Sequence, residues 1–161
     1  MKWMMLPLVL MLAACGLRPL YGTSEGAVSR AELSRVAVSA IDERSGWLLR
    51  NALVDRLGSS DEAPLYRLDI VIDDDITRFG IRGDAAATRE RRTLRARYQL
   101  VDLSSGETVL DATAGFDAGI DITSSEYATV AAEQTASERL AQEVADDMVA
   151  RIALYLSRSG Q

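Results

Sequence analysis

Histidine is absent from this 161-residue sequence, and Cys15 is its only cysteine. Without histidine, the chain cannot build the Ser-His or Cys-His pair of a nucleophilic enzyme. The common zinc and copper sites need histidines or several cysteine thiolates, so these metal sites are excluded as well. A single cysteine also rules out a disulfide within the chain. The usual catalytic and metal-binding chemistries therefore do not account for this protein.

An excess of positive charge is also absent, since 24 acidic residues outnumber 18 lysines and arginines and the formal net charge is −6 at pH 7. Nucleic-acid binding through a general basic surface is therefore not expected, because it needs an excess of lysine and arginine. Glycan hydrolysis would need two carboxyl groups roughly 5–10 Å apart across a cleft. The acidic runs Asp73-Asp74-Asp75 and Asp146-Asp147 are contiguous instead, and we expect them to hydrate a surface. We predict no enzyme activity.

A long hydrophobic run is missing too. The main apolar stretch, residues 4–14, is interrupted by Pro7 and is shorter than the roughly 20 residues that a transmembrane helix needs. Lys2 precedes this stretch, and the small residues Ala13 and Ala14 end it directly before Cys15. A positive start, a short apolar run and small residues at its end are typical of an export signal. The sequence thus predicts a leader rather than a membrane-spanning helix.

The stretch Leu12-Ala13-Ala14-Cys15 resembles the lipobox of bacterial lipoproteins. The resemblance implies a signal peptide over residues 1–14, after which Cys15 becomes the first residue of the mature chain. Cys15 would carry diacylglycerol and an N-acyl chain, and no other cofactor is implied. Several acyl chains on one residue form a durable anchor, whereas a single chain binds membranes only marginally. The alternative is that Cys15 lies inside a signal peptide that is cut elsewhere.

Residues 15–30 predict a lipidated tether, because they are rich in glycine and serine and contain Pro19. Leu17, Leu20 and Tyr21 make this tether apolar enough to dock on a surface. Gly16 stands where many lipoproteins carry an acidic signal for retention in the inner membrane. Its presence implies transfer of the protein to the outer membrane.

Apolar alternation predicts four strands, over residues 35–41, 66–73, 94–100 and 110–116. Helical spacing predicts a helix over residues 45–57, ended by Gly58, and a longer helix from a capping box at residues 123–126 to about Leu156. Gly106 marks a hairpin turn. The order β-α-β-β-β-α, with one apolar face on each element, predicts an α+β fold. We expect a two-layer sandwich over residues 31–161, with two helices on a four-stranded mixed sheet.

Three stretches resemble the LptE family of lipopolysaccharide-assembly lipoproteins in its alphaproteobacterial form. They are residues 15–22, residues 98–102 with the Ser-Gly-Glu turn after them, and residues 127–133 with the helix that follows. The resemblance implies an anchored protein on the periplasmic face of the outer membrane. It would act as plug and assembly partner of the LptD β-barrel in lipopolysaccharide transport to the cell surface. The alternative is a stand-alone periplasmic lipoprotein that binds lipid or peptidoglycan.

Arginines gather in one region of this acidic chain. Between the second and third predicted strands lie Arg78, Arg82, Arg89, Arg91 and Arg92. The arginine fork binds phosphate through paired donors, and lipid A carries phosphates. Together with the family resemblance, this pattern predicts that these five arginines contact lipopolysaccharide. The alternative is ion pairing with nearby carboxylates, with Arg95 and Arg97 on the solvated face of the third strand. The carboxylates in question are Asp73, Asp74, Asp75, Asp84 and Glu90.

Overall fold

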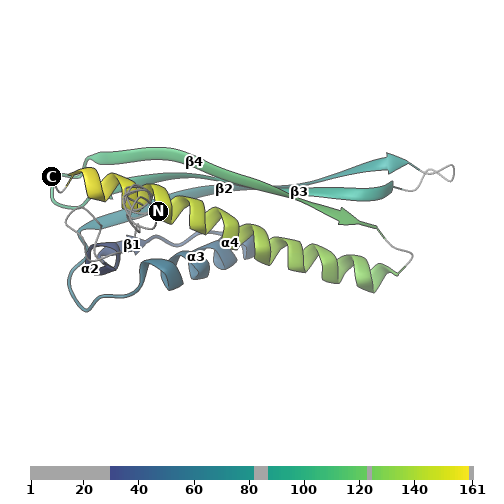
Figure 1. The fold of residues 1–161 in the computed structure, drawn as a ribbon, viewed down its shortest axis with the longest axis horizontal. Coiled ribbons are helices and arrows are strands. Elements are labelled where there is room, and N and C mark those ends of the chain that lie inside the picture. Colours follow the sequence, from purple (N-terminus) through teal and green to yellow (C-terminus); the bar gives the residue numbers. More distant parts are fainter. Residues whose placement is uncertain (1–29, 82–86, 123–124, 160–161) are drawn as a thin grey trace, which may run out of the picture.

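The computed structural model describes residues 30–81, 87–122 and 125–159 (Figure 1). The elements are α2 (Arg30–Leu33), β1 (Val36–Val38), α3 (Glu43–Leu57), β2 (Tyr66–Ile81), β3 (Ala87–Asp102), β4 (Thr108–Asp121) and α4 (Glu126–Ser159). The predicted α+β sandwich is confirmed, with the short helix α2 added before the first strand. Cys15, the expected signal peptide and nearly all of the expected tether lie outside the described residues.

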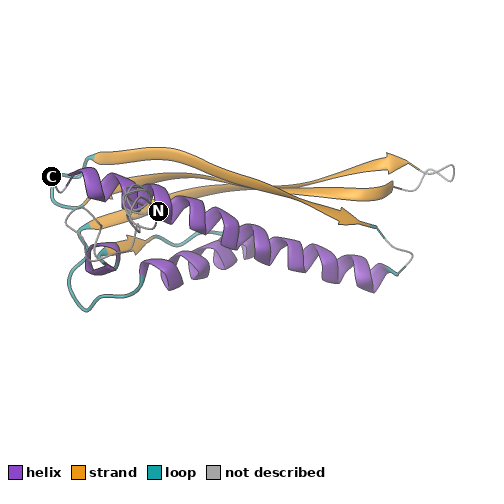
Figure 2. Ribbon diagram, in the orientation of Figure 1, coloured by secondary structure: helices purple, strands orange, loops and turns teal. Residues whose placement is uncertain are grey.

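The four strands form one mixed sheet in the order β1-β2-β3-β4. β1 pairs with β2 in parallel, since α3 carries the chain back between them, and the other two pairs are antiparallel. Both α3 and α4 lie on the same side of the sheet (Figure 2). The second face of the sheet carries no helix in the part of the chain that the structure describes.

The core lies between the sheet and the helices. Alternate residues of β2 and β3 point toward the helices, as the period of two requires, and Leu68, Tyr98 and Leu100 are fully buried. α4 meets them with an apolar stripe at four-residue steps, formed by Leu140, Val144, Met148, Ile152 and Leu156. Buried alanines beside this stripe, such as Ala141 and Ala145, let the helix pack closely on its neighbours.

The molecule is elongated, because β2 and β3 are each 16 residues long and extend well beyond β1 and α3 (Figure 1). Ser45 in the first turn of α3 reaches Asp74 in the middle of β2. Beyond that point, only the N-terminal half of α4 accompanies the strands. We call the half with β1 and α2 the proximal half, and the half with the β2–β3 connection the distal half.

The predicted helix ends and the predicted hairpin turn are largely confirmed. Gly58 ends α3 with a φ of 84°, and its N–H donates to the carbonyl of Val54 at 2.9 Å. Gly106 adopts a φ of 75° in the β3–β4 turn, where a side chain would be strained. At the start of α4, the hydroxyl of Ser125 accepts a hydrogen bond from the N–H of Ala128 at 3.4 Å. Residues 123–124 of the expected capping box lie outside the described residues.

Tyr98 is an unusual member of the core. Its side chain is fully buried, and its hydroxyl has no hydrogen-bond partner among the described residues. Burial raises the pKa of this phenol. A buried polar group without a partner costs about 1–3 kcal/mol, so Tyr98→Phe is expected to raise the free energy of unfolding by about 1 kcal/mol. Urea denaturation measures this, and Tyr127→Phe, at an exposed tyrosine, should leave the value unchanged. Equal stability of Y98F and wild type would contradict the prediction.

Candidate functional site

The arginine region is a long β-hairpin and not a loop between short strands. β2 runs to Ile81 and β3 begins at Ala87, so Arg78, Arg89, Arg91 and Arg92 all lie on strands. Arg82 lies outside the described residues. The predicted strand ends at residues 73 and 94 were wrong, because charged side chains point inward in this part of the hairpin. Those charges interrupt the alternation from which a strand is recognised.

The hairpin divides these arginines between two faces, since successive side chains of a strand point in opposite directions. Arg78 and Arg92 point toward the helix layer, where their carboxylate partners lie. Arg89 and Arg91 lie on the uncovered face and pair with carboxylates of β4. The arginines predicted as one site therefore form two pairs with different surroundings.

Arg92 belongs to a buried cross-link. Its guanidinium binds Asp74 in a bidentate manner, with Nε at 2.9 Å from Oδ1 and Nη2 at 2.6 Å from Oδ2. Ser45 of α3 also donates to Asp74, and Arg92 Nη1 donates to the carbonyl of Glu133 in α4 at 3.4 Å. The side chains of Arg92 and Asp74 are only 16% and 8% exposed. The cluster ties β2, β3, α3 and α4 together, which leaves Arg92 no free donor set for a ligand.

Arg78 is paired with a second buried carboxylate. Its Nε donates to Glu90 Oε1 at 2.6 Å, and the Glu90 side chain is 1% exposed. Glu90 Oε2 has no hydrogen-bond partner among the described residues. Burial raises the pKa of nearby Glu133, and the hydrogen bond and charge of Glu90 raise it further, against the opposing charges of Arg78 and Arg92.

Arg89 and Arg91 are exposed and weakly held. Arg89 pairs with Asp121 at 3.1 Å, and Arg91 approaches Asp117 at 3.9 Å while its guanidinium carbon lies 5.4 Å from the centre of the Phe79 ring. Exposed ion pairs of this kind contribute at most about 1 kcal/mol, so a phosphate can replace the aspartate. Along the same face, Arg97 pairs with Asp111 at 2.9 Å. The prediction that Arg95 and Arg97 lie on a solvated face is confirmed.

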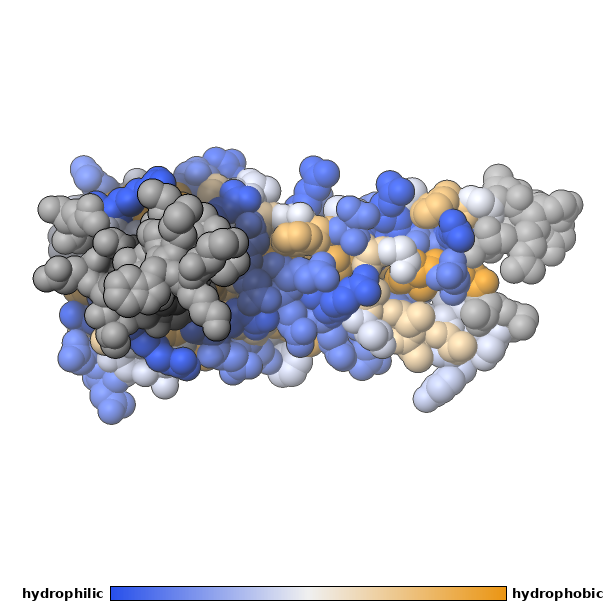
Figure 3. All heavy atoms as spheres, viewed as in Figure 1, coloured by the Kyte–Doolittle hydropathy of each residue, from blue (hydrophilic) through white to orange (hydrophobic). Residues whose placement is uncertain are grey.

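Apolar side chains accompany these arginines in the distal half. Phe79 and Phe116 on the strands are each 39% exposed, and Tyr127 and Val130 at the start of α4 are 85% and 55% exposed. In Figure 3, apolar residues likewise gather in the half that lies away from the C-terminus. We call Phe79, Tyr127 and Val130, with Arg78, Arg89 and Arg91, the distal tip. Phe79, Arg89 and Arg91 lie together on the uncovered face, whereas Tyr127 and Val130 belong to α4 on the other side of the sheet. The uncovered face of the tip therefore combines apolar surface with guanidinium groups, as the binding of an anionic amphiphile requires.

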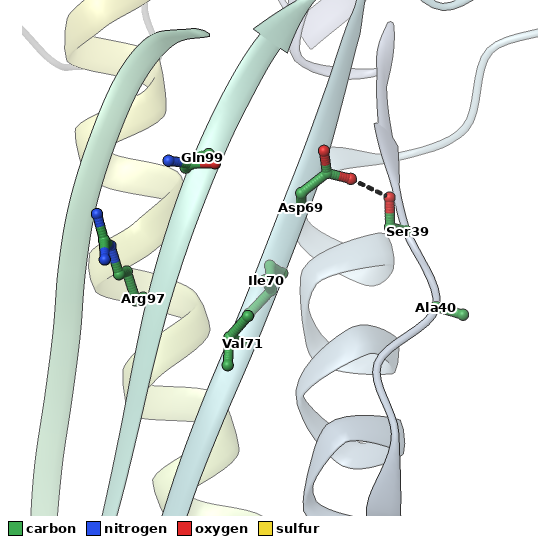
Figure 4. A pocket seen from close by; sticks show the side chains of 7 residues that line it. All are labelled: Ser39, Ala40, Asp69, Ile70, Val71, Arg97 and Gln99. Carbon is green, nitrogen blue, oxygen red and sulfur yellow. Dashed lines mark hydrogen bonds between the residues drawn. The ribbon is translucent and has the colours of Figure 1, made fainter.

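A hollow of about 310 Å³ opens on the uncovered face where β1 leaves the sheet (Figure 4). Ser39 donates to Asp69 at 2.6 Å, and Arg67 binds the same carboxylate at 2.9 Å. The hydrogen bonds from Arg67 and Ser39 lower the pKa of Asp69. A carboxylate held in its charged form is a poor general base. This hollow shows no arrangement for catalysis.

Two other kinds of site were sought in the described parts of the chain. Within residues 30–81, 87–122 and 125–159, no three metal-ligating side chains come together. None of the described helices has the length and apolarity to cross a membrane.

Comparison with known proteins identifies the family. The family model for LptE, described as lipopolysaccharide-assembly, matches residues 33–152. Among solved structures, the chain is similar to a lipoprotein from Caulobacter crescentus, at 28% identity and a TM-score of 0.67, over 81% of this chain and 96% of that one. No curated protein matches it.

Two more distant structures share the fold. Rare lipoprotein B from Shewanella oneidensis aligns at 8% identity and a TM-score of 0.61, over 78% of this chain and 98% of its own. Lipoprotein B from Nitrosomonas europaea aligns at 10% identity and a TM-score of 0.59, over 76% and 83% of the two chains. Such low identities support the architecture alone. The family match, in contrast, extends from α2 through the whole sheet into the last turns of α4, and the chain belongs to the LptE family of lipopolysaccharide-assembly lipoproteins.

Proposed function

We propose that this protein is the plug and assembly partner of the outer-membrane barrel LptD, and that it assists lipopolysaccharide transport to the cell surface. The observation that carries the proposal is the family match over residues 33–152. The fold agrees with it physically. The interior of a transmembrane barrel is polar, and the uncovered face of the sheet presents arginine–aspartate pairs that are compatible with a wet wall.

The proposed anchor is Cys15, with diacylglycerol on its sulfur and an acyl chain on its nitrogen once residues 1–14 are removed. It would hold the tether of residues 15–30 at the periplasmic face of the outer membrane. No catalytic role is included in the proposal. The carboxylates Asp74 and Glu90 are buried and held by arginines.

Purification from detergent-solubilised membranes tests the plug and the anchor together. With a C-terminal tag at native expression level, we expect one large barrel protein to be recovered in stoichiometric amount. The intact mass of the tagged chain should correspond to a start at Cys15 with added acyl chains. Recovery of the chain alone, together with normal barrel assembly after depletion, would instead favour a stand-alone lipid- or peptidoglycan-binding lipoprotein.

We further propose that the distal tip contacts lipopolysaccharide. Arg89 and Arg91 can exchange their exposed aspartate partners for phosphates of lipid A, while Phe79 on the same face offers apolar surface to its acyl chains. Arg78 contributes charge at the same end, and its side chain is 66% exposed. Arg82 remains part of the prediction from its place in the sequence. Arg92 is left out, since Asp74 and Glu133 occupy its donors.

The double substitution Arg89→Gln and Arg91→Gln is expected to weaken binding of purified lipopolysaccharide by about tenfold or more, since each charged hydrogen bond contributes roughly 1.5–3 kcal/mol. The matched control is Arg95→Gln with Arg97→Gln, which removes the same charge from the same face of the same strand. Binding measured at two salt concentrations should show a smaller salt dependence only for the first variant. Equal losses in both variants would mean that total charge matters and the tip does not.

A further inference from the structure

A groove runs along the outer side of the helix layer, between α3 and α4. It consists of two hollows of about 290 Å³ and 300 Å³, which share Asp55 and Arg56 as lining residues. α3 and α4 run in the same direction, because Trp47 and Glu138 line one hollow together while Arg56 and Asp146 line the other. Arg56 pairs with Asp146 across the helices, with Nη2 at 3.0 Å from Oδ2. We call this feature the interhelical groove.

The groove has an apolar floor and a charged rim, on which the carboxylates Asp55, Glu138 and Asp146 outnumber Arg30 and Arg56. Ala52, Ala141 and Val149 lie at its bottom and are buried, and Trp47 stands at its distal end with 61% of its surface exposed. Asp55 and Glu138 lie on the rim, and both are exposed. An exposed tryptophan above an apolar floor is surface that gains free energy when it is covered. A suitable occupant has apolar side chains and a positive charge.

The chain itself provides such an occupant. The described part of the chain begins at Arg30, and Arg30 lines the proximal hollow of the groove. Residues 16–29 precede it and would span about 46 Å if fully extended. α3, which forms one wall, is 15 residues long, or about 22 Å. The segment is therefore long enough to pass from Arg30 along the whole groove to Trp47.

The composition of residues 16–29 also fits the groove. Leu20 and Tyr21 are large apolar or amphipathic residues close to the far end of the segment, at a distance from Arg30 that reaches Trp47 with slack to spare. Arg18 is the only positive residue of the segment, and Glu138, which lines the same hollow as Trp47, is the rim carboxylate nearest to its place beyond Leu20. Glycines at positions 22 and 26 allow the chain to follow a curved path.

We propose that residues 16–29 bind in the interhelical groove as a strap, with Leu20 and Tyr21 covering Trp47. The tether is then a fixed part of the domain, and the anchor at its start is held near the outer side of the helix layer. Only the first few residues remain free to bridge the distance to the membrane. The strap is an intramolecular contact, so it goes beyond the proposed function and does not depend on the barrel or on lipopolysaccharide.

Trp47 reports on the strap directly, because it is the only tryptophan after residue 14. The probe is a chain of residues 15–161 with Cys15→Ser, which keeps every described element and needs no detergent. In this chain we expect blue-shifted emission and little quenching by acrylamide. With Leu20→Ser and Tyr21→Ser, the quenching constant should rise by about twofold or more, since quencher access follows exposed area. The control Thr23→Ala with Ser24→Ala should behave as the unaltered tether does.

Limited proteolysis gives a second measurement, because it probes the strap instead of Trp47. Glu25 is the only acidic residue of the strap, so a glutamate-specific protease cuts the strap at one place. Asn51→Trp places a bulky side chain in the groove and should accelerate cleavage after Glu25, whereas Arg139→Trp, at an exposed position of α4 that does not line the groove, should not. If quenching and cleavage are the same in all these chains, the strap is absent and the proposal is wrong.

Discussion

Replacing Arg92 with methionine is expected to lower the free energy of unfolding by about 3–5 kcal/mol, because it leaves a buried carboxylate without its partner. The substitution keeps the length of the side chain but removes both hydrogen bonds to Asp74. Asp74 is 8% exposed, so it cannot recover these interactions from water. Urea denaturation at pH 7 measures the loss.

The pH dependence of this effect follows from Asp74. Burial alone would raise the pKa of this carboxyl, but hydrogen bonds from Arg92 and Ser45 outweigh burial and hold the pKa below its usual value. In the wild type, the stabilisation is therefore present above about pH 4 and is lost as the pH falls through the lowered value. In the variant, a buried and unpaired Asp74 takes up a proton more readily, which relieves its cost in acid. The difference between the two proteins should shrink from pH 7 to pH 4.

A matched double variant distinguishes the effect of losing the ion pair from the effect of losing the packing of its side chains. Arg92→Met with Asp74→Leu removes both charges and should recover most of the lost stability, since an apolar pair of similar volume often replaces a buried ion pair without cost. A double variant as unstable as R92M would show that the guanidinium acts mainly through Glu133 of α4 and not through Asp74.

Leu140→Ala is expected to cost about 2–5 kcal/mol, a large part of the 5–15 kcal/mol by which a domain is normally stable. Leu140 has no exposed surface and lies where α4 crosses the sheet, so the truncation leaves a cavity. Thermal unfolding followed by circular dichroism measures the effect as a lower melting temperature. Leu154→Ala is the matched control in the same helix, because Leu154 is 43% exposed and should lose less than about 1 kcal/mol. Similar losses of stability at both positions would show that Leu140 does not belong to the main core.

The elements with regular apolar spacing could be predicted from the sequence. The stripe from Leu140 to Leu156 is the buried face of α4, and the alternation from Leu94 to Leu100 is the buried face of β3. Gly58 and Gly106 occupy the cap and the turn that their chemistry favours. In each case, one local pattern determines the structure without help from the rest of the chain.

The distal half of the hairpin could not be predicted, because its inward positions carry charges. Asp74, Glu90 and Arg92 take positions that alternation would reserve for apolar residues, and each is tolerated only because a partner lies on another element. Such pairing depends on the register between β2 and β3, which the local sequence does not determine. The same reason explains why Arg78 and Arg92 were grouped with Arg89 and Arg91, although they lie on the opposite face.

The first strand was predicted too long, over residues 35–41, where the structure has Val36–Val38. Val36 and Val38 have the β-branched character of a strand, but Ser39 and Ala40 leave the sheet on the way to α3. Where an edge strand departs depends on where the next helix must begin. Here Ser45 has to reach Asp74, which is a tertiary requirement.

The unpaired outer edge of β4 exposes the free chain to self-association. β4 forms one margin of the sheet over 14 residues without a proline, lysine or arginine, and in the described parts of the chain no other strand pairs with that margin. Backbone donors and acceptors exposed in this way are a template on which a second chain can add, and natural proteins usually block them with such residues. Self-association through this margin would grow with the concentration of unenclosed protein. Under the proposed function, a cell that made more of this protein than its barrel partner could enclose would face aggregation, which would favour balanced synthesis of the two.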